Sequence, residues 1–417
     1  MAPPPRPHPL SRSPHVQRVC GWLESAWDKG IANRPSLDPD VLWGKALRDI
    51  PAEGERGPRS DEDMADFRLR LEVLVESLEA EARLNSLGLT MAHGQLVRVI
   101  RQRLELGELW RAQPEVVEHK LAPPIIVVGQ MRSGTTRVHR LLAADPAHAA
   151  TRFCDSWLPV PRRPDTRPAW SALTLLAART LDPWLDSIHP FGTTRADEEL
   201  GWLACALDHC AYEAQWRIPA FTAFSEDRDP APVYREFARI LRTDAHFHGN
   251  ADRPRVLKVP QFAEDLPALL AQFPDARVVL TSRDDADIAR SSASLVANQM
   301  TIQSDAVDMA WLQAEVARKI ALRQQRMDVA VAGFTGPLAK VDFAALDSDW
   351  EVAMAQLYAD LGQPLSPEAR EAMRAERGRM EADGHEHHRQ SYDDFGDPSS
   401  GSTARNMNTS EFADGRP

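Results

Sequence analysis

Cysteine is scarce in this sequence: it occurs four times in 417 residues, as Cys20, Cys154, Cys205 and Cys210. So low a count excludes a disulfide scaffold of the kind that stabilises small secreted domains. No two of the four form a C-x-x-C pair, so the spacing of thioredoxin-like redox sites and zinc ribbons is missing as well. The chain must rely on an ordinary hydrophobic core, and it is long enough to bury one.

Long apolar runs are also missing. No stretch approaches the ~18 uninterrupted apolar residues of a membrane-spanning helix, and the longest buried-looking run is Ile125–Val128. Residues 1–15 are rich in proline and contain no apolar segment of the kind found in secretory signals. We therefore expect a cytoplasmic protein with no integral membrane segment.

Basic residues are outnumbered, since 49 Lys and Arg stand against 61 Asp and Glu for a formal net charge of −12. An acidic surface repels nucleic acids and anionic lipids, so we expect no nucleic-acid partner. The net charge is an average over the whole surface and does not exclude a small polyanionic ligand. A small-molecule substrate fits this composition, and a homodimer is compatible with it.

Hydrophobic spacing divides the chain into four regions. Residues 1–15 are expected to be disordered because they are polar and rich in proline. Helical periodicity, as in the apolar stripe that begins at Phe67, predominates over residues 16–120 and predicts a helical region packed on the core. Residues 121–384 are expected to form that core. Residues 385–417 are rich in Gly, Ser and Asp and are expected to form a tail.

Three short runs are compact and largely apolar, Ile125–Val128, Val256–Val259 and Val278–Thr281, and Leu338–Phe343 is a fourth candidate strand. Such runs are typical of strands buried on both faces of a parallel sheet. Segments with helical spacing separate them. The pattern predicts an α/β fold in which a doubly wound parallel sheet is flanked by helices.

The segment after the first of these runs has the pattern of a phosphate-binding loop. Gly129 opens the loop, Gly134 closes it, and a helix is expected over Thr135–Asp145. Backbone N–H groups in such a loop bind anions together with the helix N-terminus. The spacing matches a Walker A loop, except that Thr135 stands where nucleotide hydrolases have lysine. The only cation in the loop is Arg132, which places the charge for a different anion.

A second segment repeats the strand–loop–helix arrangement. Arg283 follows the run Val278–Thr281, at the sheet edge where ligands of open α/β sheets bind. Ser291 lies eight positions later, about two helical turns on. Arginine suits phosphate because its guanidinium is planar and permanently charged. Together with the first loop, Arg283 and Ser291 predict a second phosphate contact.

The two segments resemble the cofactor motifs of the sulfotransferases that use 3′-phosphoadenosine 5′-phosphosulfate (PAPS). Met131–Thr136 is similar to the 5′-phosphosulfate loop, commonly written P-K-S-G-T-T or, in bacterial members, P-R-[ST]-G-T-T. Arg283 and Ser291, followed by a Ser-Leu pair, resemble the 3′-phosphate motif. The resemblance covers residues 121–300 well and points, less specifically, to the large bacterial branch of the family. It implies a P-loop-like fold, PAPS as donor, and sulfuryl transfer to a hydroxyl or amine.

The same resemblance implies a set of cofactor-binding residues: Arg132, Ser133, Gly134, Thr135, Thr136, Arg283 and Ser291. Two positions depart from the family pattern. Asp285 occupies the place of a proline often found two residues after the motif arginine. Phe262 stands where many bacterial relatives carry a histidine, four residues after Lys258, so a catalytic histidine cannot be carried over.

Sulfuryl transfer requires in-line attack, removal of the acceptor's proton, and positive charge over the sulfuryl and leaving phosphate oxygens. Arg132 suits the leaving phosphate, and Lys258, at the end of a predicted strand, suits the bridging oxygen or the sulfuryl group. Two residues compete for the role of general base. They are His189, in a loop before a helix, and Glu198, expected with Glu199 in the first turn of that helix. The sequence leaves both open, along with a base elsewhere.

Three further features receive plainer interpretations. The run His385–His388 has no matching ligand constellation, so we expect a polar surface and no metal. Residues 161–168 (PRRPDTRP) are expected to form an exposed loop over the cleft and to act as a lid. Five aromatic side chains are interpreted as core in preference to an acceptor pocket: Trp157, Trp202, Tyr212, Trp216 and Phe221.

The favoured hypothesis is a PAPS-dependent sulfotransferase acting on a small, partly apolar acceptor. One alternative is a P-loop kinase-like nucleotide enzyme, which Thr135 and Arg283 argue against because neither is the residue that such an enzyme needs there. The other is a protein that binds adenosine bisphosphate without catalysis, which the phenylalanine at position 262 motivates.

Overall fold

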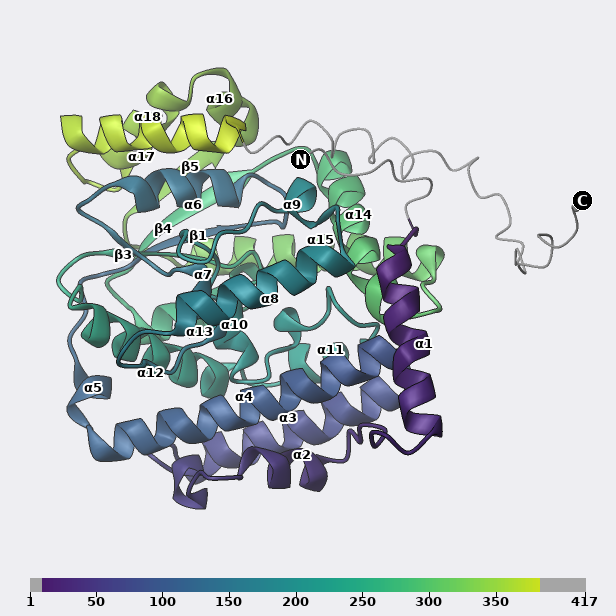
Figure 1. Cartoon of the computed structure of the whole chain (residues 1–417). Coiled ribbons are helices and arrows are strands. Elements are labelled where there is room, and N and C mark those ends of the chain that lie inside the picture. The colour runs from purple at the N-terminus through teal and green to yellow at the C-terminus, as the bar shows by residue number, and fades with distance from the viewer. Residues whose placement is uncertain (1–9, 383–417) are drawn as a thin grey trace, which may run out of the picture.

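A five-stranded parallel sheet lies at the centre of the molecule (Figure 1). The structure is a computed structural model and describes residues 10–382. The strands run in the order β2-β3-β1-β4-β5, and each neighbouring pair is parallel. Their bounds are β1 (Ile125–Gly129), β2 (Ala149–Ala150), β3 (Arg255–Lys258), β4 (Arg277–Ser282) and β5 (Leu338–Asp342). The predicted α/β fold is confirmed, and the four predicted strands correspond to β1, β3, β4 and β5.

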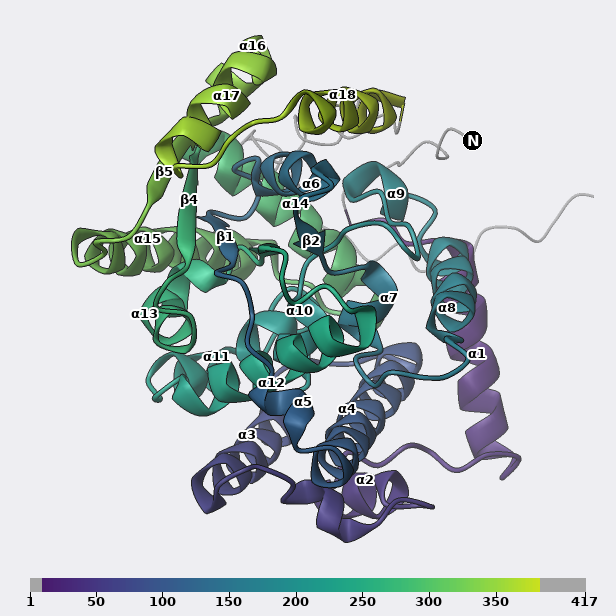
Figure 2. The same cartoon turned by 90° about the vertical axis from the view of Figure 1, so that its left-hand side faces the viewer.

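Strand β1 is buried on both faces, which explains its uninterrupted apolar sequence. Ile125 and Val127 pack on the face covered by α6 (Thr135–Ala144), α17 (Trp350–Asp360) and α18 (Pro367–Ala382). Ile126 and Val128 face the opposite core. The helices that contribute to this opposite core include α10 (Leu200–Ala204), α12 (Ala231–His248), α13 (Phe262–Gln272) and α15 (Met309–Ala332). Figure 2 shows the two layers on either side of the sheet.

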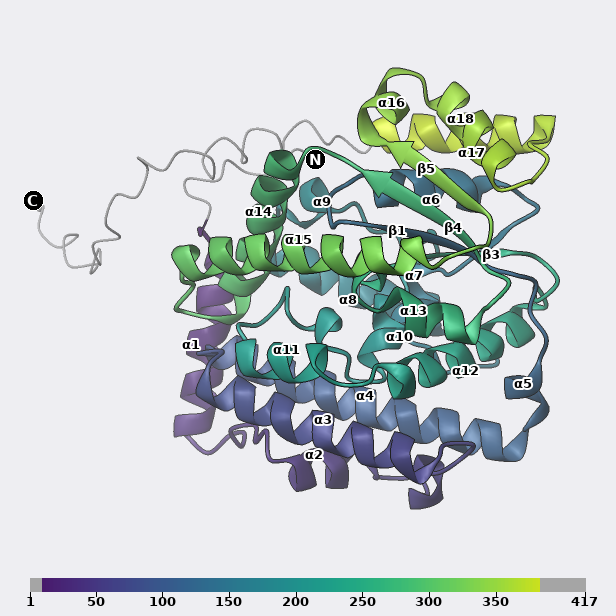
Figure 3. The same cartoon turned by 180° about the vertical axis from the view of Figure 1, so that it is seen from behind.

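The N-terminal helices form a further layer, which lies at the bottom of Figures 1 and 3, away from α16 (Phe343–Ser348) and α17. Its apolar stripes, with Leu71 and Leu96 among them, pack against Tyr212 and Trp216. The helices are α1 (Pro14–Asp28), α2 (Pro39–Ala46), α3 (Asp61–Ala80), α4 (Ser86–Ala112) and α5 (Glu115–Glu118).

Helix α1 begins at Pro14, so the predicted disorder of residues 1–15 is wrong for Pro14 and His15. Ser13 caps this helix by accepting a hydrogen bond from the His15 amide. The histidine run at 385–388 and the rest of the tail lie outside the described residues.

Shorter elements complete the fold: η1 (Ala52–Glu55), α7 (Phe153–Trp157), α8 (Arg167–Leu181), α9 (Leu185–Ile188), η2 (His209–Ala211), α11 (Pro219–Glu226) and α14 (Asp285–Gln303). Within residues 10–382, no helix combines the length and the apolar character needed to cross a membrane.

The sheet topology determines where a ligand can bind. The chain passes from β1 outward to β2 and β3 on one side, whereas β4 and β5 lie on the other side. Between β1 and β4 the strand order therefore changes direction, and ligands of open α/β sheets bind at such a point. Gly129 at the end of β1 pairs with Thr281 near the end of β4, so the loops that follow these two strands start side by side.

Candidate active site

The loop after β1 is held in one conformation by its own contacts. Arg132 and Gly134 both have positive φ values, 71° and 94°. A Cβ atom on Gly134 would lie 2.6 Å from the Phe343 ring, so glycine is required there both for its conformation and for space. Ser133 donates from Oγ to the Gln130 carbonyl over 2.7 Å, and its Oγ lies 2.7 Å from Thr281 Oγ1 on β4. Helix α6 starts at Thr135, as predicted, and its N-terminus faces the same space.

The two predicted phosphate segments meet directly. Arg132 donates from Nε to Ser291 Oγ over 2.7 Å, and Arg283 donates from Nη1 to the Arg132 carbonyl over 3.2 Å. The Arg283 guanidinium also lies over the Phe343 ring, 4.5 Å from its centroid, and 3.3 Å from the Asp287 carboxylate. The loop after β1 and the start of α14 therefore form one site.

Lys258 ends β3 with its side chain fully buried beside this loop. Its Nζ donates to Thr136 Oγ1 over 3.0 Å and forms an ion pair with the Glu198 carboxylate. Its backbone N–H donates to a Glu199 carboxylate oxygen over 2.8 Å. One lysine thus connects the phosphate loop to both glutamates that the sequence singled out.

Glu198 and Glu199 were predicted to lie in the first turn of a helix, and this is wrong. Helix α10 begins at Leu200, and Glu199 is its N-cap residue. The two carboxylates also have different surroundings. Glu198 is partly exposed and lines a cavity. Glu199 is buried, and burial raises the pKa of its carboxyl to about 8 despite the hydrogen bond from the Lys258 amide.

His189 follows α9 and lies against Phe191 with ring centroids 4.5 Å apart. Its Nε2 is 3.4 Å from Oδ1 of Asp197, a buried carboxylate that the sequence analysis did not single out. Burial would raise the pKa of Asp197, but His189 and Lys258 outweigh it and lower that pKa to about 2. Asp197 is therefore ionised at neutral pH.

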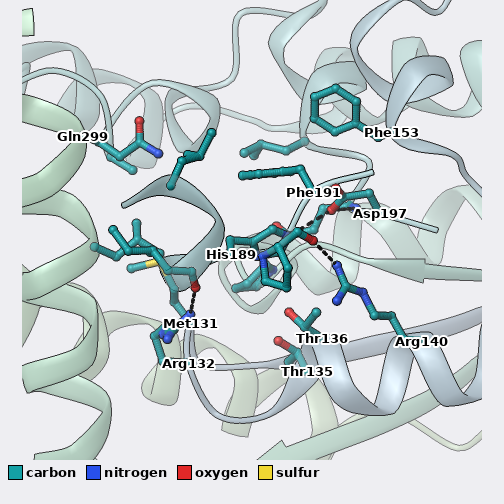
Figure 4. A pocket seen from close by; sticks show the side chains of 18 of the residues that line it. Met131, Arg132, Thr135, Thr136, Arg140, Phe153, His189, Phe191, Asp197 and Gln299 are labelled. Carbon is teal, nitrogen blue, oxygen red and sulfur yellow. Dashed lines mark hydrogen bonds and ion pairs between the residues drawn. The ribbon is translucent and has the colours of Figure 1, made fainter. Parts of the chain in front are cut away.

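Eight of these residues line one cavity of about 1630 Å³: Arg132, Gly134, Thr135, Thr136, His189, Asp197, Glu198 and Arg283. Lys258 and Ser291 are fully buried and contact residues of its wall. Figure 4 shows Arg132, Thr135 and Thr136 on one side of it, with His189 and Asp197 facing them. Arg140, on α6, donates to the Pro190 carbonyl over 2.8 Å and so connects that helix to the histidine loop. Further lining side chains are polar near the loop, namely Arg137, Arg283 and Arg290, and largely apolar beyond it, with Phe153, Trp157, Trp170 and Leu175.

The remaining predictions divide between cavity and core. Trp202, Tyr212, Trp216 and Phe221 are core residues, whereas Trp157 lines the cavity. Phe262 is fully buried against Tyr234 and Phe237, so it offers no group to the site. Of the expected loop 161–168, the last two residues belong to α8, and it is this helix that contributes side chains to the cavity wall.

Three groups of described residues bring potential metal ligands within 4.8 Å of one another, and one of them, His189 with Asp197 and Glu198, faces the cavity. In that group Glu198 is already paired with Lys258 and Asp197 with His189. These pairings explain the cluster without an ion. The sequence-based expectation of a metal-free site stays a prediction.

Comparison with known proteins places these features in a family. A model described as "Sulfotransferase family" matches residues 123–367, more than half of the chain. A search of curated proteins found no match. Among solved structures, sulfotransferase STF1 from Mycobacterium tuberculosis H37Rv is similar at 27% identity and a TM-score of 0.73, over 82% of this chain and 93% of that one.

Sulfotransferase STF9 from Mycobacterium avium has a similar fold, with a TM-score of 0.72 at 19% identity, over 82% of this chain and 88% of that one. The family model and the structural likeness agree with the two motifs that meet at β1 and β4. The chain belongs to the sulfotransferase family.

Proposed function

We propose that this protein transfers a sulfuryl group from PAPS to a hydroxyl or amine of a small, partly apolar acceptor. The observation that carries the proposal is the convergence of the loop after β1 with Arg283 and Ser291, beside a cavity that Arg132 and Arg283 line. Membership of the sulfotransferase family supports the reaction class.

The donor set fits a nucleotide with phosphate groups at two positions. Arg132, Arg137, Arg283 and Arg290 line the loop end of the cavity, so cationic charge is concentrated there despite the acidic net charge of the chain. In this proposal residues 132–136 hold the 5′-phosphosulfate through the loop and the N-terminus of α6. Arg283 and Ser291 hold the 3′-phosphate.

PAPS supplies a sulfuryl group on a phosphate leaving group. The acceptor oxygen forms a bond to sulfur while the bond from sulfur to the phosphate oxygen breaks, and the electron pair leaves with adenosine 3′,5′-bisphosphate. Lys258, in contact with Thr136 of the loop, stabilises negative charge on the bridging and sulfuryl oxygens. Arg132 does the same for the leaving phosphate. Positioning and charge account for this chemistry, and no metal takes part.

The acceptor's proton needs a base, and we propose Glu198. Its carboxylate contacts Lys258 and lines the cavity, so it lies where the acceptor oxygen would meet the sulfuryl group. His189 is the second candidate, because Asp197 would stabilise the imidazolium formed when it takes up a proton.

The experiment that tests this function combines [35S]PAPS with phenols, sterols, glycolipids and amines, in parallel with [γ-32P]ATP. We expect the 35S label in an acceptor and adenosine 3′,5′-bisphosphate as the second product. Transfer of 32P without 35S would instead favour a kinase-like enzyme. Binding of the bisphosphate with no transfer to any acceptor would favour the non-catalytic alternative that Phe262 motivates.

A further inference from the structure

Helix α4 contributes two polar residues to the cavity wall, Gln95 and Arg98. In all three views α4 lies toward the bottom of the molecule and α6, which carries the phosphate loop at its start, lies toward the top (Figures 1–3). Arg98 therefore belongs to a helix on the side of the molecule away from α6, and it lines the same cavity as the phosphate loop. None of the roles proposed above uses it.

Among the described residues, Arg98 has no salt bridge to a carboxylate. Its Nε is buried and has no hydrogen-bond partner within residues 10–382. The nearest ring is that of Trp157, 5.8 Å away. Burial lowers the pKa of Arg98, and the smaller opposing effects come from Cys205 and Tyr212. Burial raises the pKa of the Cys205 thiol to about 12, so it is uncharged at neutral pH.

Most of the fully buried arginines of this chain are paired with carboxylates. Six of them lie within 4 Å of a carboxylate in the pairs Arg59–Glu236, Arg70–Asp66, Arg103–Glu55, Arg167–Asp155, Arg255–Asp244 and Arg323–Glu264. A buried charge without a partner is costly, which is why these pairs are expected. Arg98, which is partly buried and lines the cavity, has no such pair among the described residues, and a ligand in the cavity can supply the missing anion.

We propose that Arg98 recognises an anionic group on the acceptor, a carboxylate or a phosphate, at the end of the molecule opposite the hydroxyl that receives the sulfuryl group. This inference rests on the proposed function, since it names the acceptor class for that same cavity. The guanidinium fork suits both anions, because each offers two oxygens to two N–H donors.

The other side chains of the cavity wall describe the rest of the acceptor. It includes Leu158, Trp170 and Leu175, with the Trp157 ring beside the guanidinium. Apolar walls with a few polar groups are typical of sites that orient an amphiphilic ligand. The acceptor class is therefore a hydroxylated molecule with an apolar body and an anionic end.

A chain-length series tests this inference. The probes are ω-hydroxy carboxylates and ω-hydroxyalkyl phosphates of increasing length, each compared with the neutral diol of the same length. For every probe, kcat/KM with PAPS and the affinity of the protein–bisphosphate complex are both measured. We expect the anionic members to be preferred by about 10- to 100-fold at one chain length, the range of a charge-assisted contact.

The Arg98→Leu variant should lose this preference through a rise in KM, with adenosine 3′,5′-bisphosphate affinity unchanged, and Arg98→Lys should restore part of it. The matched control is Arg101→Leu, one turn along α4, where the side chain is paired with Glu105 at the surface. Equal preference for charged and neutral probes in the unmodified protein, or a preference that survives Arg98→Leu, would overturn the inference and leave the proposed reaction standing. If no probe is sulfated, the affinities of the charged and neutral probes for the parent and for Arg98→Leu still decide the role of Arg98. The absence of PAPS turnover would count against the proposed function alone.

Discussion

Arg132 and Ser291 are 159 positions apart in the chain, and a hydrogen bond of 2.7 Å joins them. The pairing of β1 with β4 places the two segments side by side. The hydrogen bond then connects the loop after β1 to helix α14, which carries Ser291. A nucleotide that contacts both segments would therefore bind to a single preorganised surface.

A double-mutant cycle measures that connection. We expect Arg132→Lys and Ser291→Ala each to weaken adenosine 3′,5′-bisphosphate binding about 5- to 20-fold, with a coupling energy of ~0.5–1.5 kcal/mol. Isothermal titration calorimetry supplies the four affinities. Ser292→Ala is the matched control, since this neighbouring buried serine lacks a hydrogen-bond partner for Oγ among the described residues. Strictly additive effects of the two changes would contradict a shared site.

The identity of the base can be decided by two conservative changes. Glu198→Gln should lower kcat by about 10²- to 10⁴-fold and remove the acidic limb of the pH–rate profile, because the amide cannot accept the proton. His189→Asn should lower kcat less, because in this proposal His189 does not take the proton. A large loss in His189→Asn with a normal rate in Glu198→Gln would assign the role to the histidine. Full rates in both variants would place the base elsewhere.

Gly134 is a sensitive point of the phosphate loop. In Gly134→Ala the new Cβ would meet the Phe343 ring, and the residue would be held at a φ that alanine rarely adopts. We expect a destabilisation of ~1–3 kcal/mol, together with weaker bisphosphate binding. Chemical denaturation and calorimetry provide the two readouts.

Gly94→Ala is the control for that variant, because this glycine lies in α4 with nothing within 4 Å of the added methyl group. There the same substitution should be neutral or stabilising, by up to ~1 kcal/mol. An equal loss of stability in both variants would show that the loop conformation is not responsible.

His248 predicts a pH dependence of stability. Hydrogen bonds to Asp155 and Asp244 raise the pKa of its imidazole to about 9. The stability that His248 gains from the two aspartates is fully present below the unfolded pKa of ~6.5 and is lost as pH rises through the folded pKa of about 9. The full shift corresponds to ~3 kcal/mol, and solvent exposure of the residue reduces this to an expected ~1–2 kcal/mol.

Urea unfolding at pH 6 and pH 9.5 measures this effect in the parent and in His248→Gln. The loss of unfolding free energy between the two pH values should be larger in the parent by that amount. Equal pH dependence in the two proteins would assign the titration to another group.

The strands and the phosphate loop could be predicted because their signals are local. Burial on both faces makes β1 a continuous apolar run, and the spacing of Arg132 and Gly134 is set within a single loop. Pairings between distant segments could not be predicted in this way. The contact of Lys258 with Glu198 depends on how β3 meets the turn before α10, and that helix begins two residues later than the acidic sequence suggests.

Two residues show the limit most clearly. Asp197 carries no motif, and only the position of His189 makes it a member of the site. In the sequence Arg98 is one of several arginines in a long helical segment. It became a candidate only because the fold places it at the cavity without a carboxylate partner among the described residues. Both depend on tertiary packing, which spacing along the chain does not encode.

The most direct test of the account is the discrimination between adenosine 3′,5′-bisphosphate and adenosine 5′-phosphate, because only the first carries the 3′-phosphate assigned to Arg283. Calorimetry should give tight binding of the bisphosphate, no measurable affinity for ATP, and a preference over the monophosphate that falls about 10- to 100-fold in Arg283→Ala. Arg277→Ala, at the opposite end of the same strand, should keep that preference. Tight ATP binding without bisphosphate binding, or an unchanged preference in Arg283→Ala, would contradict the account.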